Sequence, residues 1–348
     1  LSTMLEGVQM NICTIRNIEL MVRTPDFSAN NTEILCLAVE ESQLLAHSAY
    51  TIGNSAQFAV AERILHIIHS HHSYAQPTHP VLSIIWNSLY QAKMSKLMSE
   101  IPQVEPLSKD EFVEQMQIVL AEIEGMDRHF MDLVTLSRSK TALAYYTKNW
   151  FNAISGFDQQ LTSLLIHVKQ HPLQKSIAEN LSDEYCDEVP HYEVRLQWCD
   201  AVGVDLRQTD RIRDTQILTE SFAIQSFRTG ISFLRDPSFC LGLFYSIEAL
   251  HPRTCDIVCK NLRAWGLDEQ ALNYWRSHGT MDEDHAAEWL SALLASDLTP
   301  QQYANAISGA YLQLNTKGKL FHAMTAEVIR ILQQESEHMS PQTLQIAS

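Results

Sequence analysis

Long stretches of helical periodicity, with few turn-forming residues between them, constrain this chain most. Ser108 and Glu111 have capping-box spacing, and behind them apolar residues recur every three or four positions from Phe112 to Leu133. Glycine and proline number only 11 each among 348 residues, which is too few turn formers for a many-stranded sheet. The pattern predicts an all-α protein, a bundle in which one-sided helices bury their apolar stripes against each other.

Similar patterns predict the other helices. These cover about residues 33–47, 54–70, 78–99, 141–171 (closed by Pro172), 180–191, 215–234, 238–265 and 300–334, with another around His278 that Asp268 caps. Residues 1–30 have no clean period, so we expect an irregular lead-in there. The tail from Glu335 is polar, so we expect it to be frayed.

Two prolines, Pro102 and Pro106, mark the best linker in the chain, because proline lacks an amide donor and fixes φ. We therefore expect a helical extension over residues 1–106, followed by a main domain over residues 107–348. A region of this size before the main domain makes a homodimer a reasonable expectation.

The net charge of -16 argues against a nucleic-acid or anionic membrane partner, because both need clustered Lys and Arg. Seven cysteines form no CxxC, and Cys255 and Cys259 are spaced like thiols packed along one helix. Neither a basic-then-apolar signal nor an apolar run of about 18 residues occurs. We therefore expect a cytoplasmic protein.

The run from His278 to His285 carries the strongest chemical signal. Its residues His278, Asp282 and His285 occupy positions i, i+4 and i+7, which lie on one face of a helix. Two imidazoles and a carboxylate on one face predict a metal-binding stripe. The alternative is a solvated face or an ordinary ion pair.

Further candidate ligands lie upstream. Glu184 and His191 are seven residues apart, two helical turns, although Pro190 weakens that spacing argument, and Glu188 competes with Glu184 as the first ligand. Glu248 lies within a strongly apolar stretch, where a charge needs a partner or an ion.

These ligands comprise three carboxylates and three imidazoles, and such a set suits iron or manganese better than zinc. Six ligands for two ions leave coordination positions open for dioxygen and a substrate. Four positive charges on two ions against three carboxylates leave a small positive excess, which favours an anionic substrate.

The order Asn180-Leu-Ser-Asp-Glu184…His191, then Glu248 on an aromatic helix, then His278-x3-Asp282-x2-His285, resembles the haem-oxygenase-like dimetal oxidases, also called iron-containing redox enzymes. The resemblance covers about residues 125–348. It implies a haem-oxygenase-like bundle and a non-haem di-iron site that activates O2. The implied reactions are C–C cleavage, N-oxygenation or C–H oxidation of a small substrate such as an amino acid or fatty acid.

Other interpretations remain open. Glu248-x-x-His251 and Glu188-x-x-His191 fit a ferritin-type di-iron site, but that scheme leaves the 278–285 stripe unused, and Pro252 makes regular helix doubtful there. A helical binding or scaffold protein, and a metal-free thiaminase-like enzyme, are the alternatives of other classes.

Two further groups of residues have an ordinary explanation. The histidines between His66 and His72 are predicted to be surface polar residues at a helix end. Five aromatic residues are candidates for a substrate pocket but are more typical of core: Trp150, Phe151, Phe222, Phe227 and Tyr245.

Overall fold

The computed structural model describes residues 13–23, 32–71, 79–186, 189–207, 210–232 and 236–338. Every regular element within these ranges is a helix, which confirms the all-α prediction. The elements are α1 (Ile15–Arg23), α2 (Thr32–Ala46), the π-helix η1 (His47–Ile52), α3 (Ser55–His71), α4 (Pro80–Met98), α5 (Lys109–Leu136), α6 (Lys140–Ala153), α7 (Phe157–His167), α8 (His171–Cys186), α9 (His191–Ala201), α10 (Thr219–Ile231), α11 (Ser238–Trp265), α12 (Asn273–Ala295) and α13 (Pro300–His338).

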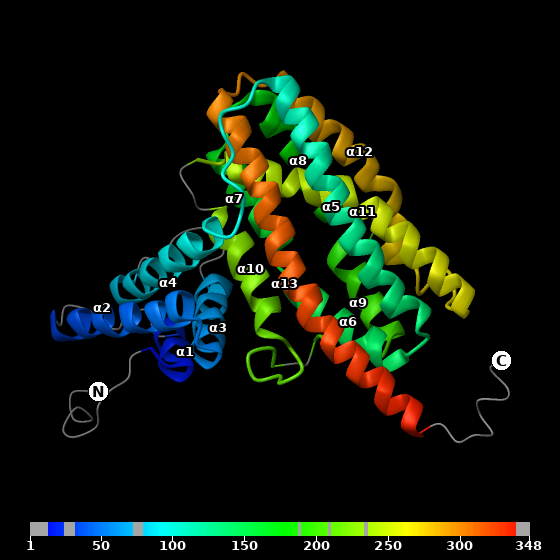
Figure 1. Cartoon of the computed structure of the whole chain (residues 1–348), viewed down its shortest axis with the longest axis horizontal. Coiled ribbons are helices and arrows are strands. Elements are labelled where there is room, and N and C mark those ends of the chain that lie inside the picture. Colours follow the sequence, from blue (N-terminus) through cyan, green and yellow to red (C-terminus); the bar gives the residue numbers. More distant parts are fainter. Residues whose placement is uncertain are drawn as a thin grey trace.

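The centre of the bundle is α11, which packs against α5, α12 and α13 (Figure 1). Glycine permits the closest of these contacts. A Cβ on Gly242 of α11 would lie 1.7 Å from the carbonyl oxygen of Ala306 in α13, and one on Gly309 of α13 would lie 1.9 Å from that of Phe239. The two backbones therefore approach more closely than side chains would allow.

The N-terminal helices α1–α4 gather at one side of the molecule, beside α10 (Figure 1). Buried Lys93 of α4 joins the two regions, since its ammonium contacts Glu62 of α3 at 2.7 Å and donates to Ser226 Oγ and to the Ala223 carbonyl of α10. The helical character of this region is confirmed. Its separation as a domain over residues 1–106 stays a prediction, as does its role in dimerisation.

Several helix boundaries differ from prediction. Residues 15–23 are helical, so the irregular lead-in was wrong there, and the rest of it lies outside the described residues except Cys13 and Thr14. The predicted helix over 141–171 is broken at Gly156, which has φ of +81°, and Pro172 lies in the first turn of α8 rather than closing that helix.

Two predicted boundaries of the C-terminal helices also differ from the structure. Asp268 accepts from the amide of Ala271, in a turn that precedes α12, so it does not cap the helix that carries His278. The last helix, α13, extends to His338, so Glu335, where we expected the chain to fray, is still helical. The capping box of Ser108 and Glu111 is confirmed.

Pro252 lies inside a continuous α11, so the expectation of irregular backbone there was wrong. Proline cannot donate to the carbonyl four residues earlier, which belongs to Glu248. The helix is held on both sides of this point by its packing against α5, α12 and α13, which outweighs the loss of one hydrogen bond.

The histidine cluster is also corrected. His66 and His69 are buried, not surface residues, because α3 packs between α4 and α10. His66 Nδ1 bonds to Gln225 Oε1 at 3.0 Å, and His69 Nε2 accepts from the indole of Trp86 at 2.8 Å. His71 is exposed, and His72 lies outside the described residues.

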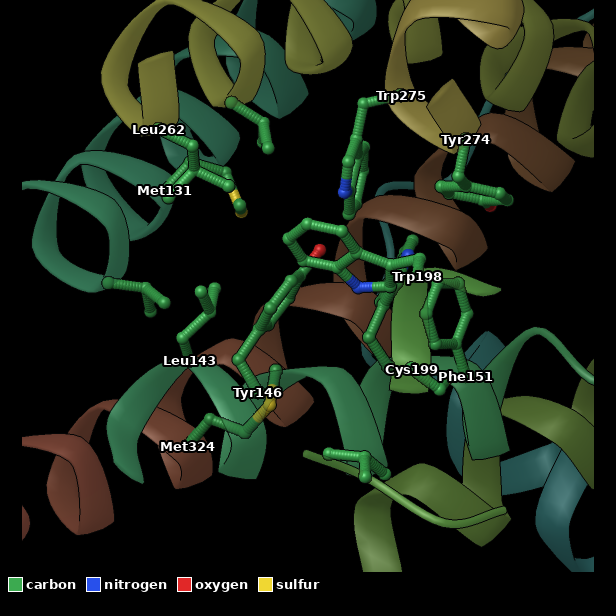
Figure 2. Packing of buried hydrophobic residues seen from close by; sticks show 14 of the residues in the cluster. Met131, Leu143, Tyr146, Phe151, Trp198, Cys199, Leu262, Tyr274, Trp275 and Met324 are labelled. Carbon is green, nitrogen blue, oxygen red and sulfur yellow. The ribbon is translucent and has the colours of Figure 1, made fainter. Parts of the chain in front are cut away.

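A second buried region, rich in aromatic residues, includes Tyr274 and Trp275 at the start of α12. Figure 2 shows Trp198 of α9 in one cluster with Tyr146, Phe151 and Trp275. The Trp198 and Trp275 rings meet edge to face, with centroids 5.6 Å apart. Cys255 and Cys259 are buried free thiols, as predicted. No helix among the described residues has the length and apolar character needed to cross a bilayer.

Candidate metal centre

Four helices bring the six predicted ligands together around one cavity of about 500 Å³. All six line this cavity: Glu184 from α8, His191 from α9, Glu248 from α11, and His278, Asp282 and His285 from α12. Their role as metal ligands stays a prediction. Glu188, the alternative first ligand, lies outside the described residues.

One half of the centre contains Glu248, Asp282 and His285. All three are buried, and one potential ligand atom from each lies within 4.8 Å of the others. The imidazole Nδ1 of His285 lies 3.5 Å from Glu248 Oε2 and 3.7 Å from Asp282 Oδ1. Two carboxylates and an imidazole that converge in the interior form a ligand set of the kind iron or manganese prefers.

The other half contains Glu184, His191 and His278. Glu184 Oε1 lies 3.4 Å from His191 Nδ1, and the rings of His191 and His278 have centroids 4.8 Å apart. Glu184 and His191 do not share one helix face, which corrects the prediction. The chain leaves α8 at Cys186, and Pro190 precedes α9, so the pair meets across the gap between two helices.

In each of two imidazoles, a hydrogen bond to one ring nitrogen leaves the other nitrogen available as a ligand. His278 Nδ1 donates to the Tyr274 carbonyl at 2.7 Å, which leaves Nε2 available as a ligand. His285 Nε2 bonds to Asp183 Oδ2 at 2.8 Å, which leaves Nδ1 facing Glu248 and Asp282. Histidines that ligate metals are typically oriented in this way.

Two further residues contact the site: Asp183, which was not predicted, and His251, which was considered only as part of a ferritin-type pair. His251 Nδ1 contacts Asp282 Oδ2 at 2.5 Å, and its ring lies 5.2 Å from that of His278. This contact leaves Asp282 Oδ1 as the oxygen nearer His285. The Glu248-x-x-His251 spacing was the available signal, and Asp183 was visible only as the residue before Glu184.

The charges in the centre influence one another strongly. Burial, reinforced by the Asp282 carboxylate, raises the pKa of Glu248. Burial alone would also disfavour a charged His285, but its bonds to Glu248 and Asp183 outweigh this and raise its pKa to about 10. Burial lowers the pKa of His278 to about 4. Such opposed shifts in one cavity are typical of functional sites.

No Lys or Arg within the described parts of the chain forms an ion pair with Glu184, Glu248 or Asp282. A cluster of three carboxylates needs compensating cations, because desolvated like charges repel. Four imidazoles supply only part of this charge: neighbouring acidic groups raise the pKa of His285 and of His251 against the effect of burial, whereas burial lowers the pKa of His278 and keeps it neutral. The donor set therefore fits divalent iron or manganese, whose charge would be balanced by the carboxylates.

Much of the remaining cavity wall is apolar and aromatic. Trp150 and Phe151 line it, as the sequence allowed, together with Tyr146, Phe157 and Phe321. Phe222, Phe227 and Tyr245 are buried core residues instead. Four cationic side chains also line the cavity: Arg195, Arg211, Arg228 and Lys317.

Comparison with known proteins agrees with this fold and centre. Residues 144–318 match the family model of the iron-containing redox enzymes. A domain of unknown function with a heme oxygenase-like fold, from Shewanella denitrificans OS217, is similar in structure with a TM-score of 0.52. It is 15% identical, over 64% of this chain and 94% of that one, so this likeness shows the fold alone. No curated protein matches the chain.

The fold and the converging carboxylates and imidazoles thus define a haem-oxygenase-like helical protein with a candidate metal centre. The chain belongs to the iron-containing redox enzyme family. The predicted resemblance and the predicted bundle are both confirmed. This fold does not support the ferritin-type alternative.

Proposed function

We propose that the protein is a non-haem di-iron oxygenase or oxidase. It uses O2 to oxidise a small, carboxylate-bearing molecule such as an amino acid or fatty acid, by C–C cleavage, N-oxygenation or C–H oxidation. The observation that carries this proposal is the buried centre itself, where three carboxylates and three imidazoles line one cavity without a Lys or Arg partner in the described chain. Family membership supports a redox role and iron as the metal.

Six residues would hold two iron ions, with manganese as the alternative metal: Glu184, His191, Glu248, His278, Asp282 and His285. Bound iron supplies the one-electron and dioxygen chemistry that amino-acid side chains lack. Asp183 and the Tyr274 carbonyl fix the rings of His285 and His278, and His251 holds one oxygen of Asp282.

The apolar wall contributes in two ways. Trp150, Phe151 and Phe321 exclude water from the space beside the ligands, which strengthens every electrostatic interaction within it. The same surfaces bind the apolar body of a substrate by burial. The cavity volume of about 500 Å³ lies within the usual range for small-molecule sites.

The proposal is tested by metal content and oxygen consumption. Protein reconstituted with Fe²⁺ without air should hold about two irons per chain and consume O2 on exposure to air. His285→Ala should lower both, because it removes a nitrogen that lies 3.5 Å from Glu248. His322→Ala is the matched control, since His322 is an exposed histidine of α13.

The assignment fails if His285→Ala retains the wild-type iron content, or if the wild-type chain binds no stoichiometric metal. In the second case the thiaminase-like or scaffold alternative gains support. This experiment does not test three other predictions, which remain predictions. They are homodimerisation through residues 1–106, a cytoplasmic location, and the lack of nucleic-acid or membrane partners.

A further inference from the structure

Three Lys or Arg residues are buried within the described parts of the chain, and they differ in their partners. Lys93 contacts Glu62 at 2.7 Å, and Lys317 contacts Asp127 at 2.5 Å. Arg228 of α10, which is only 1% exposed, forms no such ion pair. A buried guanidinium without an anion is costly, so this exception calls for a reason.

The hydrogen bonds of Arg228 are also incomplete. Its Nη2 donates to the neutral amide oxygen of Gln313 in α13 at 3.3 Å, and its Nε has no partner in the structure. Burial is the cause that lowers the pKa of Arg228, to about 10, so it remains charged at neutral pH. The guanidinium therefore carries a positive charge that no anion of the described chain pairs with, and at least one of its N–H donors has no acceptor there.

Arg228 lines the same cavity as the candidate metal centre, as do Gln313 and Lys317. Asp127 is engaged through Oδ2, which accepts from both Lys317 and Thr254, whereas its buried Oδ1 has no hydrogen-bond partner and the described chain shows no ion pair between Asp127 and Arg228. Lys317 also lies over the rings of Trp150 and Phe321, at 5.2 and 5.3 Å from their centroids. Two buried cations and one carboxylate leave this wall with one unbalanced positive charge.

We propose that Arg228, oriented by Gln313, binds the carboxylate of the substrate and so holds the substrate's apolar body in the cavity beside the carboxylates and imidazoles. A guanidinium matches a carboxylate through parallel N–H···O bonds. This inference rests on the proposed function and assigns the specificity residue of the same cavity. Its ligand is any carboxylate on an apolar body, whether an alkyl chain or an amino acid.

The test is calorimetric titration of the full, metal-free chain with two pairs of probes. Octanoate is compared with octan-1-ol, and L-phenylalanine with L-phenylalaninol, so that each pair differs in the carboxylate. We expect at least one carboxylate to bind, and Arg228→Met to weaken it about tenfold or more, as loss of a charged hydrogen bond predicts. The alcohols should be affected by less than about twofold. The pair that responds identifies the body of the ligand.

Arg195→Met is the matched control. It removes one positive charge from the same cavity, but Arg195 is half-buried and lies over the rings of Phe151 and Tyr192. Its effect on carboxylate binding should be small. Arg228→Lys keeps the charge but cannot form two parallel N–H···O bonds, so it should give intermediate affinity. This variant also keeps the test valid if Arg228→Met does not fold.

Thermal unfolding separates ligand binding from a structural role. If Arg228 serves to bind a ligand, Arg228→Met should leave the melting temperature of the ligand-free chain unchanged or raise it. The reason is that the substitution removes an uncompensated buried charge. The proposal is overturned if neither carboxylate binds, if binding is the same in Arg228→Met and Arg228→Lys as in wild type, or if Arg195→Met weakens it equally.

Because the titration uses metal-free protein, its outcome can be told apart from that of the iron experiment. Arg228-dependent binding by a chain that takes up no iron would leave the carboxylate-binding role of Arg228 in place and remove the di-iron function. Iron uptake and oxygen consumption with no Arg228-dependent binding would do the reverse.

Discussion

Two buried polar regions of this molecule contrast in how far their groups satisfy one another. In the N-terminal region, Glu62 accepts from Tyr50 at 2.9 Å, from Lys93 at 2.7 Å and from Ser226 at 2.6 Å. One negative and one positive charge cancel there. In the candidate metal centre, three carboxylates face four imidazoles, and the described chain provides no Lys or Arg to bridge them.

We infer from this difference that some buried polar groups stabilise the fold and that others serve a ligand. A network that is complete within the chain holds helices in register and excludes alternatives. A buried network that lacks charge balance destabilises the free protein. Such a network is retained where a bound ligand supplies the missing charge. Arg228, buried without an anion, belongs to the second kind, although it lies on α10 as Ser226 does.

The largest expected effect tests the completed network. Lys93→Met should destabilise the protein by about 3–5 kcal/mol, because Glu62 would remain buried without its cation. Urea unfolding gives this value. The double variant Lys93→Met/Glu62→Gln should recover most of the loss, since it removes both charges. A single variant as stable as wild type would contradict the importance of the pair.

A pH-dependent effect tests a histidine in the same region. Burial lowers the pKa of His66 to about 4 from its ordinary value of 6.5. Between pH 6.5 and 4, His66 is therefore protonated in the unfolded chain and neutral in the folded chain. The free energy of unfolding consequently falls as the pH drops from 6.5 to 4. The loss amounts to about 3 kcal/mol at pH 4. His66→Gln should flatten this slope in urea unfolding at a series of pH values, and an unchanged slope would refute the prediction.

The third effect tests the incomplete network. Asp183 orients His285 through a bond of 2.8 Å, so Asp183→Ala should weaken Fe²⁺ binding about 10–100-fold. Competition with a chelator, without air, measures this affinity. Ser182→Ala, an exposed change one residue earlier in α8, should leave it unaffected. Equal affinities in Asp183→Ala and wild type would mean that Asp183 does not act on the metal centre.

The smallest effect concerns an exposed ion pair. Lys175 and Glu179 of α8 approach to 3.1 Å with side chains 66% and 46% exposed. Water and salt screen such a pair, so Lys175→Met should not shift the urea midpoint measurably. A shift comparable with that of Lys93→Met would show that burial is not what distinguishes the two pairs.

Periodicity was sufficient to predict the long helices. α5 and α11 were found because their apolar residues repeat at helical intervals over many turns, with a capping box before one and Gly266 after the other. Breaks set by single residues were missed. Gly156 divides a continuous pattern. Likewise α8 ends at Cys186 and α9 begins at His191, although the spacing from Glu184 to His191 equals two helical turns.

Within the site, the sequence revealed residues whose spacing lies on one helix, as in the 278–285 stripe. It did not reveal partners that come from different helices. Asp183 meets His285 across 102 residues, and His251 meets Asp282 across 31. The same limit explains the error at His66, whose burial depends on α10, 159 residues away at Gln225.

We expect the six convergent side chains to bind a pair of iron ions. The decisive measurement is a crystal structure of the iron-loaded protein, with anomalous diffraction recorded at the iron absorption edge. Two adjacent iron peaks should appear in the cavity, bounded by Glu184, His191, Glu248, His278, Asp282 and His285. A cavity with no iron peak, in crystals of protein loaded with excess Fe²⁺, would contradict this expectation.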